Sequence, residues 1–479
     1  MRRQTRCLAL LALASMLGLE ATAHAGGFLV ARFGGEHGHP TTTDATALYY
    51  NPAGLAFASG TRVYLDGSFA LRTATYDRPA GAIDHVGTGT PSDGVSANSG
   101  RATLSNAIAS PFFGVVSDLG QPGLAVGLSF STPFGGPSVW DSRDTLKTSP
   151  YPGAVDGPQR WASIDGTIRS SYVTLGGAYQ IAPARLSIGL SANLVLSQVN
   201  TVRARNGNGT DDLVSSGGAV QEGRSVIDVR GTTGSIGVGV VWRPIDELWL
   251  GASYQSQPGF GEMKLEGTLD SKLATAAMTH DKVEVLQSLP DVVRWGGRFR
   301  PSKQLELRVF GDFARWSVFD KQCLLNQNDP KRSCTLNPDG TLDGPGGGSG
   351  VTFAVPRHWK NTFGVRAGGS YWVTPEVEAF VGGGFDSNAV PNATIDPALF
   401  DMNKGSASAG ARVTLLEQRL IVDATFTQVF YASRTIAPRP RDGSGDAVSP
   451  AQPPSRTPDM AGTYAQAASV LVVGVGYTF

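Results

Sequence analysis

The 479-residue chain has few charged residues, few cysteines and, beyond its N-terminal segment, no long apolar run. Charged residues make up 17% of the chain, and 40 basic residues balance 40 acidic ones. Proteins that bind nucleic acid or an anionic surface usually carry a basic excess or a basic block. The composition therefore predicts no nucleic-acid partner.

The chain also lacks the short motifs that mark common enzyme classes. It contains no G-x-S-x-G elbow, no P-loop and no H-E-x-x-H motif. His37 and His39 are spaced like metal ligands, but no third ligand lies nearby, so we expect both to face solvent. The sequence therefore predicts no enzyme activity, no catalytic residue, no metal and no cofactor.

The N-terminal segment has the three-part layout of a secretory signal peptide. Basic residues up to Arg6 precede an apolar run from Leu8 to Leu19, which ends at Ala23-His24-Ala25. A membrane anchor is the alternative, but the apolar run is too short to span a bilayer. We therefore predict that residues 1–25 are a signal peptide cleaved after Ala25.

Cysteine is scarce, and cleavage of the signal peptide removes Cys7 and leaves only Cys323 and Cys334. An even pair in an exported protein favours a disulfide. The two residues flank a short polar segment, and a zinc site would need further ligands that are not nearby. The sequence therefore predicts a disulfide that staples a surface loop.

Beyond the signal peptide, no apolar run reaches the roughly 18 to 20 residues that a membrane-spanning helix requires. An exported chain with this property is either soluble or crosses a membrane as a β-barrel. Residues 62–76 favour the barrel, because apolar and polar residues alternate there as in a strand with one apolar face. The apolar positions are Val63, Leu65, Phe69 and Leu71, and the polar ones are Arg62, Asp66, Ser68 and Arg72.

The same alternation recurs along the chain and predicts 14 strands. They lie near residues 62–76, 107–118, 123–134, 161–179, 185–201, 224–243, 247–262, 284–300, 304–320, 359–373, 377–388, 404–416, 419–433 and 464–479. Short turns such as Gly120-Gln121-Pro122 alternate with longer loops rich in Gly, Pro, Asn and Ser, an asymmetry typical of outer-membrane barrels. We therefore predict an all-β fold, a transmembrane antiparallel 14-stranded β-barrel over residues 61–479.

The last strand supports a membrane barrel, because one of its faces is an apolar stripe that ends at the aromatic residue Phe479. Chains delivered to the outer-membrane barrel assembly machinery end in this way, so that machinery is an expected partner. The 61 glycines of the chain also fit, because small residues let tilted strands pass closely and bend where a barrel closes.

Residues 26–60 show no strand alternation. Thr43 or Asp44 is suited to cap a short helix that ends at Asn51, because the residue before Pro52 is pushed out of the helical region. A segment of this size cannot form its own core and must pack against something larger. We therefore predict that residues 26–60 form a partly helical hatch inside the barrel lumen.

Several stretches resemble the FadL/TodX family of outer-membrane transporters for hydrophobic compounds. The mature start Gly26-Gly27-Phe28 and the stretch Tyr50-Asn51-Pro52-Ala53-Gly54-Leu55 resemble that family's hatch. Thr132-Pro133-Phe134-Gly135 and Ala314-Arg315-Trp316-Ser317 resemble its strand ends, and Arg294-Trp295-Gly296-Gly297 resembles its mid-chain strand. The resemblance covers essentially the whole mature chain, and the family's 14-stranded barrel agrees with the strands expected from alternation.

The resemblance implies passive uptake in the bacterial outer membrane. A hydrophobic compound, such as a long-chain fatty acid, would enter the lumen and leave sideways into the bilayer through a gap beside the third strand. The expected gate residues are Asn51, Pro52, Ala53 and Gly54, and those of the third strand are Gly127, Pro133 and Gly135. The expected partners are that ligand, outer-membrane lipid and lipopolysaccharide, and the protein is expected to be a monomer.

Strand parity suggests which side chains line the lumen. The candidate ligand-binding residues are Arg294, Arg298, Arg308, Phe310, Trp316 and Phe380. The arginines suit a carboxylate headgroup, but they suit equally well a pairing with Asp312, Glu306 or the hatch. Two rival functions remain open, a general diffusion porin and an outer-membrane lipid hydrolase.

Overall fold

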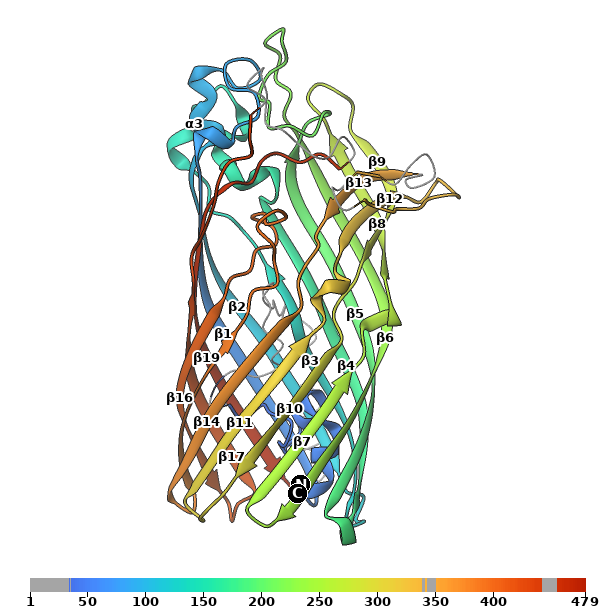
Figure 1. The fold of residues 1–479 in the computed structure, drawn as a ribbon, viewed down its shortest axis with the longest axis vertical. Coiled ribbons are helices and arrows are strands. Elements are labelled where there is room, and N and C mark those ends of the chain that lie inside the picture. The colour runs from blue at the N-terminus through green and yellow to red at the C-terminus, as the bar shows by residue number, and fades with distance from the viewer. Residues whose placement is uncertain (1–33, 35, 338–340, 343–349, 442–454) are drawn as a thin grey trace, which may run out of the picture.

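The structure is a computed structural model that describes residues 34, 36–337, 341–342, 350–441 and 455–479. The predicted signal peptide, residues 1–25, and the start of the predicted hatch lie outside the described residues. Figure 1 shows a tall β-barrel with short turns at one end and long loops with short helices at the other. Within the described ranges, no helix is both long and apolar enough to cross a membrane.

The predicted antiparallel barrel of 14 strands is confirmed. Among the described residues, nine strands are continuous: β1 (Thr61–Arg78), β2 (Gly100–Ser117), β3 (Leu124–Pro137), β4 (Asp165–Ile181), β5 (Leu186–Arg205), β6 (Gly223–Ile245), β15 (Val377–Asp386), β16 (Lys404–Leu415) and β19 (Gly462–Thr478). Five others are each interrupted once: β7 (Leu248–Gln255) with β8 (Met263–Lys272), β9 (Thr279–Gln287) with β10 (Val292–Phe299), β11 (Leu305–Ala314) with β12 (Lys321–Asn326), β13 (Val351–Pro356) with β14 (Thr362–Thr374), and β17 (Leu420–Tyr431) with β18 (Arg434–Ile436). Strand β1 pairs with both β2 and β19, which closes the barrel.

The strands are longer than predicted at the end with long loops. Strand β2 begins at Gly100, where the sequence pattern predicted a start near residue 107, and β13 was not predicted. The outward residues at this end of β2 are Arg101, Thr103 and Ser105, so the outer face of the strand is polar there. Periodicity of apolar residues therefore underestimates the strand length there.

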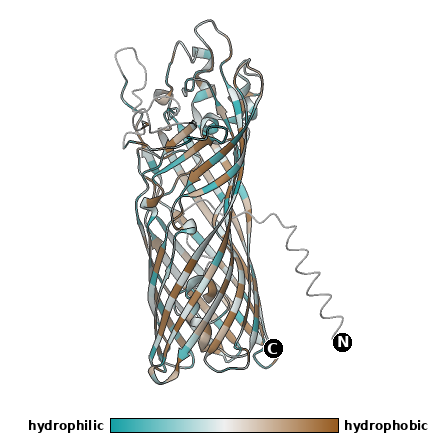
Figure 2. Cartoon of the chain, turned by 90° about the vertical axis from the view of Figure 1, so that its right-hand side faces the viewer, coloured by the Kyte–Doolittle hydropathy of each residue, from teal (hydrophilic) through white to brown (hydrophobic). Residues whose placement is uncertain are grey.

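The outer face of the barrel is apolar and the inner face is mixed. Outward side chains that remain exposed in the isolated chain include Leu71, Leu175, Leu190, Val309, Phe426 and Val473. Inward side chains on β1, such as Asp66 and Arg72, are buried. Figure 2 shows the hydrophobic residues spread along the strands of the barrel wall. The alternation therefore has the orientation expected of a barrel whose outer face contacts lipid.

Short helices occur inside the barrel and in the connections. They are α2 (Ala47–Tyr50), η1 (Pro52–Phe57), η2 (Ala80–Ala82), η3 (Ser92–Gly94), α3 (Val95–Asn98), η4 (Asp144–Leu146), η5 (Pro152–Asp156), η6 (Pro158–Trp161), η7 (Ala182–Ala184), η8 (Pro258–Phe260) and η9 (Trp316–Val318). The helix predicted in the hatch, with Thr43 or Asp44 as its cap, begins at Ala47 in the structure. Asp44 accepts the backbone N–H of Thr46 at 2.8 Å and so supports its first turn.

The long loops pack into a cap over one end of the barrel. Arg78 and Asp211 form a fully buried ion pair at 2.6 Å, and Arg160 forms another with Glu222 at 3.0 Å. Buried charges are retained only where they are paired, so these contacts fix the loops relative to the strands.

A disulfide joins Cys323 of β12 to Cys334 in the following loop, with 6.4 Å between the Cα atoms. Both cysteines are buried beside Leu286 and Ala354. The disulfide therefore ties this loop to β12.

Candidate functional site

The hatch segment (residues 36–60) lies against the inner face of β2 to β7, where a row of glycines makes room for it. A Cβ on Gly189 would lie 2.2 Å from the backbone nitrogen of Ala53, and one on Gly239 would lie 1.9 Å from Oδ1 of Asn51. Glycine is required where two backbones approach this closely. The glycine row consists of Gly114, Gly127, Gly176, Gly189, Gly239 and Gly251, one from each of β2 to β7.

Asn51 links α2 to η1 and fastens the hatch segment to the barrel wall. Its Nδ2 donates to the carbonyl oxygens of Pro40 at 2.7 Å, Val240 at 3.0 Å and Ala252 at 3.3 Å. Its Oδ1 accepts the backbone N–H of Ala53 at 3.1 Å. The side chain is completely buried, so each of these bonds replaces one that water would otherwise supply.

The other three predicted gate residues form the start of η1. Pro52 occupies the first position of this helix, where its missing N–H costs nothing. The Oγ of Ser187 donates to the Ala53 carbonyl oxygen at 2.7 Å. A Cβ on Gly54 would lie 1.9 Å from the carbonyl oxygen of Thr42, so only glycine fits there. The four residues form one compact contact with β5 to β7, and their role as a gate stays a prediction.

The three predicted arginines contact protein groups inside the barrel. The guanidinium carbon of Arg294 lies 4.6 Å from the ring centroid of Tyr49 in the hatch segment. Arg298 and Arg308 both approach Glu306, with N–O distances of 3.9 and 3.6 Å. This geometry favours the alternative in which the arginines pair with Glu306 and the hatch.

His37 and His39 are buried in the lumen, so the expectation that they face solvent is wrong. His37 Nε2 lies 3.0 Å from a Glu378 carboxylate oxygen, and its ring packs edge-on against Phe380. The ring of His39 lies 6.0 Å from that of Phe310. Phe310 and Phe380, two of the predicted ligand-binding residues, therefore contact the hatch segment. Strand periodicity does not reveal the path of that segment across the lumen.

Arg366 of β14 is an inward residue that the sequence prediction missed. It forms ion pairs with Asp312 and Asp386, and all three side chains are buried. Its inward parity on the strand predicted near residues 359–373 could have identified it as a lumen residue. The two carboxylates therefore occupy the donors of Arg366, and the buried guanidinium is compensated by protein groups.

The ladder between β2 and β3 is interrupted, and we call this unpaired stretch of the wall the window. These strands form only five ladder pairs, and Phe113 with Phe130 is the last pair before they separate. They meet again where the side-chain amide of Asn106 donates to the Pro137 carbonyl oxygen at 3.2 Å. The window is edged by residues 107–112 and 131–136.

Strand β3 bends at the window because one extra residue interrupts its pairing with β4. The register shifts between Ser131 and Phe134, and the intervening Pro133 has no N–H to donate. Gly135 follows with a φ of +98°, and a Cβ there would lie 1.8 Å from the carbonyl oxygen of Ile168. Two of the predicted third-strand residues therefore lie at the window edge.

Gly127 lies elsewhere, in the paired part of β3 below the window. It pairs with Val116, and a Cβ at this position would lie 3.1 Å from Cδ1 of Leu48 in the hatch segment. The carbonyl oxygen of Val115 on β2 would lie closer still, at 2.8 Å, so both β2 and the hatch crowd this position. Its predicted part in the lateral opening stays a prediction.

An aromatic cluster (Phe134, Tyr172, Trp316, Phe319 and Trp359) lies on the lumen side of the window. Phe134 comes from the window edge, and its ring lies 6.1 Å from that of Trp316 in an edge-to-face arrangement. The indole nitrogens of Trp316 and Trp359 are buried and have no hydrogen-bond partner among the described residues. Of the six lumen residues predicted from parity, only Trp316 belongs to this cluster.

A cavity of about 110 Å³ lies between the aromatic cluster and the cap. Ile168 and Leu399 line the cavity and also pack in the aromatic cluster, so the two are continuous. Other apolar side chains in the cavity wall are Val199, Ile227, Val285, Leu324 and Phe353. An apolar protein cavity of about 150 Å³ holds benzene, so this one accepts a small group or one end of a longer ligand.

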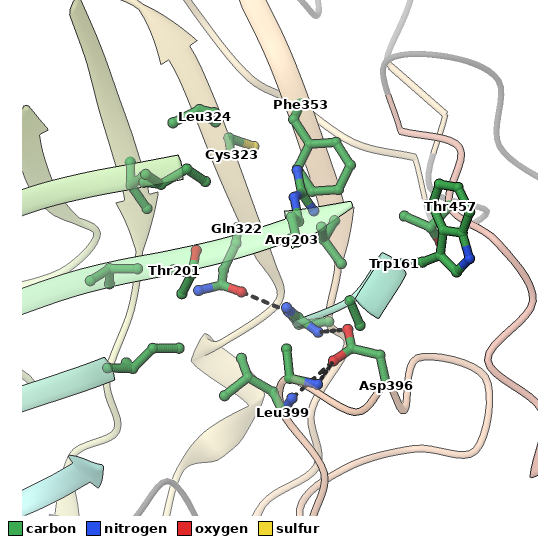
Figure 3. A pocket seen from close by; sticks show the side chains of 18 of the residues that line it. Trp161, Thr201, Arg203, Gln322, Cys323, Leu324, Phe353, Asp396, Leu399 and Thr457 are labelled. Carbon is green, nitrogen blue, oxygen red and sulfur yellow. Dashed lines mark hydrogen bonds and ion pairs between the residues drawn. The ribbon is translucent and has the colours of Figure 1, made fainter. Parts of the chain in front are cut away.

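Arg203 lines this cavity from the loop end of β5 (Figure 3). Its guanidinium carbon lies 3.7 Å from the ring centroid of Phe353. Its Nε and Nη2 atoms are buried, and within the part of the chain that the structure describes they have no hydrogen-bond partner. The neighbouring Arg357 differs, because Asp396 binds it at 2.6 Å. The cavity therefore combines an apolar wall with a guanidinium of which two nitrogens have no hydrogen-bond partner among the described residues.

The sequence prediction also missed Arg203. Its odd number places it on the inward face of β5 together with Val195 and Val199, which was a usable signal. That parity does not show whether Arg203 has an acidic partner, because the nearby acidic residue Asp396 comes from a loop far along the chain.

Comparison with known proteins agrees with this architecture. The family described as outer membrane protein transport protein (OMPP1/FadL/TodX) matches residues 6–479. A putative outer membrane protein of Neisseria meningitidis serogroup B is 25% identical over 410 residues, which cover 81% of this chain and 80% of that protein.

Solved structures of the same fold include a FadL homologue of Pseudomonas aeruginosa and two toluene transporters. The FadL homologue has a TM-score of 0.71 and 18% identity, covering 96% of this chain and 98% of its own. TodX of P. putida and TbuX of Ralstonia pickettii have TM-scores of 0.63 and 0.62, each with 13% identity over 95% of this chain and 99% of theirs. The chain belongs to the OMPP1/FadL/TodX family of outer-membrane transport proteins of bacteria.

Proposed function

We propose that this protein takes up a hydrophobic compound with an anionic head, such as a long-chain fatty acid, and releases it sideways into the outer membrane. The observation that carries the proposal is the cavity with Arg203, whose two buried guanidinium nitrogens have no partner among the described residues. The family's relatives include transporters of toluene, which has no charge, so the head group is what distinguishes this proposal.

The electrostatics of the cavity favour an anion over a neutral ligand. A buried cation without a partner is costly, and a carboxylate that reaches Nε and Nη2 would remove that cost with two charge-assisted hydrogen bonds. The guanidinium already stacks on Phe353, which fixes its plane and so reduces the entropy lost on binding. A neutral aromatic ligand would gain neither effect.

The apolar path that leads away from Arg203 suits the hydrophobic part of the same ligand. Ile168 and Leu399 connect the cavity with the aromatic cluster, and Phe134 of that cluster lies at the window edge. An alkyl chain gains about 0.8 kcal/mol for each methylene that leaves water. Exit through the window keeps that gain, whereas passage along an aqueous pore would lose it.

The hatch segment supports lateral exit over general diffusion. Its contacts with Glu378, Arg294 and the glycine row fill the lumen below the aromatic cluster. A diffusion porin needs an open polar channel at this level. Free permeation of sugars in a liposome swelling assay would favour the porin alternative.

The test compares two ligands and two variants by isothermal titration calorimetry. The ligands are a saturated carboxylic acid and the alcohol of equal chain length. In Arg203→Met, we expect at least about tenfold weaker binding of the acid, because a hydrogen bond to a charged group contributes roughly 1.5–3 kcal/mol. Binding of the alcohol should change little.

Arg205→Met is the matched control, because Arg205 lies on the same strand and near the same ring, 5.3 Å from the Phe353 centroid, but does not line the cavity. It should bind both ligands like the native protein. Equal loss for acid and alcohol in Arg203→Met, or unchanged binding of the acid, would contradict the proposed anionic head.

A further inference from the structure

We propose that a groove on the outer face of the barrel, beside the window, binds the phosphate group of an outer-leaflet lipid. The groove has a volume of about 730 Å³ and is lined by residues of β2 to β6 and of β8. Pro111 and Phe130 line it at the window, and Arg169, Arg230 and Lys264 line its polar part. This inference rests on the outward surface alone and is independent of what the lumen carries.

The basic residues lie where the apolar wall ends, on the side of the long loops. Along β4, Arg169 follows the outward residues Leu175 and Val173 toward the loop end. Along β6, Arg230 likewise lies on the loop side of the outward residues Val238 and Ile236. In outer-membrane barrels the long loops are extracellular, so this boundary is the headgroup level of the outer leaflet.

The charge of the groove suits a phosphate. Arg169, Arg230 and Lys264 face a single acidic residue among its lining, Glu266. Arg230 and Lys264 are largely exposed, with side chains 71% and 67% accessible.

Arg230 and Lys264 lie at long distances from the carboxylates with which they pair. The nearest acidic oxygens lie 3.7 Å from Arg230, on Asp228, and 3.9 Å from Lys264, on Glu284. Ion pairs this exposed and this long contribute little, so both cations can turn toward a lipid phosphate at small cost. Arg169 adds a third donor and is held in the row by Gln198, to which it donates at 3.3 Å.

The shape of the groove suits a lipid rather than a free anion. Its window end is lined by Phe130 and Pro111, and Leu196 of β5 adds apolar surface to the lining that holds the basic residues. A lipid with its phosphate on the basic row would lie with an acyl chain against these side chains. The bound lipid would therefore border the window from outside.

The binding test uses purified native protein and three probes: bisphosphorylated lipid A, the same lipid after removal of its phosphates, and inorganic phosphate. Affinity is measured by native mass spectrometry in detergent micelles. Neutralising the basic row should weaken binding of bisphosphorylated lipid A about tenfold, which corresponds to about 1.4 kcal/mol. The row variant is Arg169→Gln with Arg230→Gln and Lys264→Gln, and the control with the same charge change is Arg101→Gln with Lys147→Gln and Arg315→Gln.

The native protein and the control should bind bisphosphorylated lipid A equally, and the dephosphorylated lipid should bind all three proteins alike. Heat-modifiable gel mobility shows that each barrel is folded. Native affinity in the row variant would overturn the proposal, and so would equal loss in the control. Competition by inorganic phosphate as strong as that by the lipid would show a free-anion site and overturn the assignment to a lipid.

Discussion

Gly239→Ala is the sharpest perturbation of the hatch that the structure offers. Gly239 lies on β6 opposite Asn51, and an added Cβ would lie 1.9 Å from Oδ1 and 2.8 Å from Cγ of that side chain. No Cβ makes contacts this short, so Asn51 must leave its place. Its bonds to Pro40, Val240 and Ala252 would be lost with it.

The expected cost follows from these contacts. Overpacking in a tight site costs about 1–3 kcal/mol, and each lost hydrogen bond costs about 0.5–1.5 kcal/mol. A combined cost of about 3 kcal/mol would lower the equilibrium constant between the docked and the undocked hatch by a factor of about 150. Gly234→Ala on the same strand is the matched control, because its nearest atom, the carbonyl oxygen of Asn193, lies 3.8 Å away.

Conductance in planar bilayers measures this equilibrium, because an undocked hatch leaves the lumen open to ions. Gly239→Ala should show higher basal conductance than the native protein, and Gly234→Ala should match the native protein. Both variants should keep heat-modifiable gel mobility, since the strands themselves are unchanged. Equal, low conductance in both variants would refute the idea that Asn51 and the glycine row hold the hatch.

Two further predictions concern the loops. Burial and the neighbouring Asp211 raise the pKa of Asp84 to about 7, so this carboxyl binds a proton more readily in the folded cap than in an unfolded loop. Cap stability should therefore fall as the pH rises from about 4 to about 7, and Asp84→Asn should remove that dependence in limited proteolysis; a native-like pH profile in the variant would contradict this assignment. Replacing Cys323 and Cys334 by Ser opens a short covalent loop, and the local stability should fall by about 2–3 kcal/mol, seen as faster cleavage after residue 323, with unchanged cleavage elsewhere as the internal control.

The barrel could be predicted from sequence because its signal is local. Alternation on β1, from Val63 to Leu71, decides which side chains face outward without knowledge of any other strand. The hatch was also predictable, since Asn51-Pro52 ends a helix in a segment too small to fold alone. Strand ends were less predictable, because β2 continues to Gly100 where the apolar stripe stops.

The site was less predictable because it depends on partners that lie far apart in the chain. Strand parity predicts that Phe310 and Phe380 point inward, and both are buried. Only the folded chain shows that His39 and His37 of the hatch segment contact them. Arg203 had inward parity, yet only the assembled loops show that its Nε and Nη2 atoms have no hydrogen-bond partner in the part of the chain that the structure describes.

The window shows the same limit. Pro133 and Gly135 indicate an irregular strand end. The separation of β2 from β3 depends on how the two strands pair, which the sequence of either strand alone does not show.

Deletion of Pro133 tests the central claim, that cargo leaves through the window. Ser131 pairs with Tyr172 and Phe134 with Ser170, so β3 has one residue more than β4 over this interval, and removing Pro133 restores regular register. The straightened β3 should pair with β2 beyond Phe130 and close the window.

The measurement is uptake of a radiolabelled hydrophobic carboxylate by cells whose outer membrane carries this protein as the added transporter, with binding to the purified variant measured in parallel. The deletion variant should keep its folded barrel and bind the carboxylate in the lumen, but its uptake should fall to that of cells without the protein. Native uptake in a variant that is folded and present in the outer membrane would contradict lateral exit through the window.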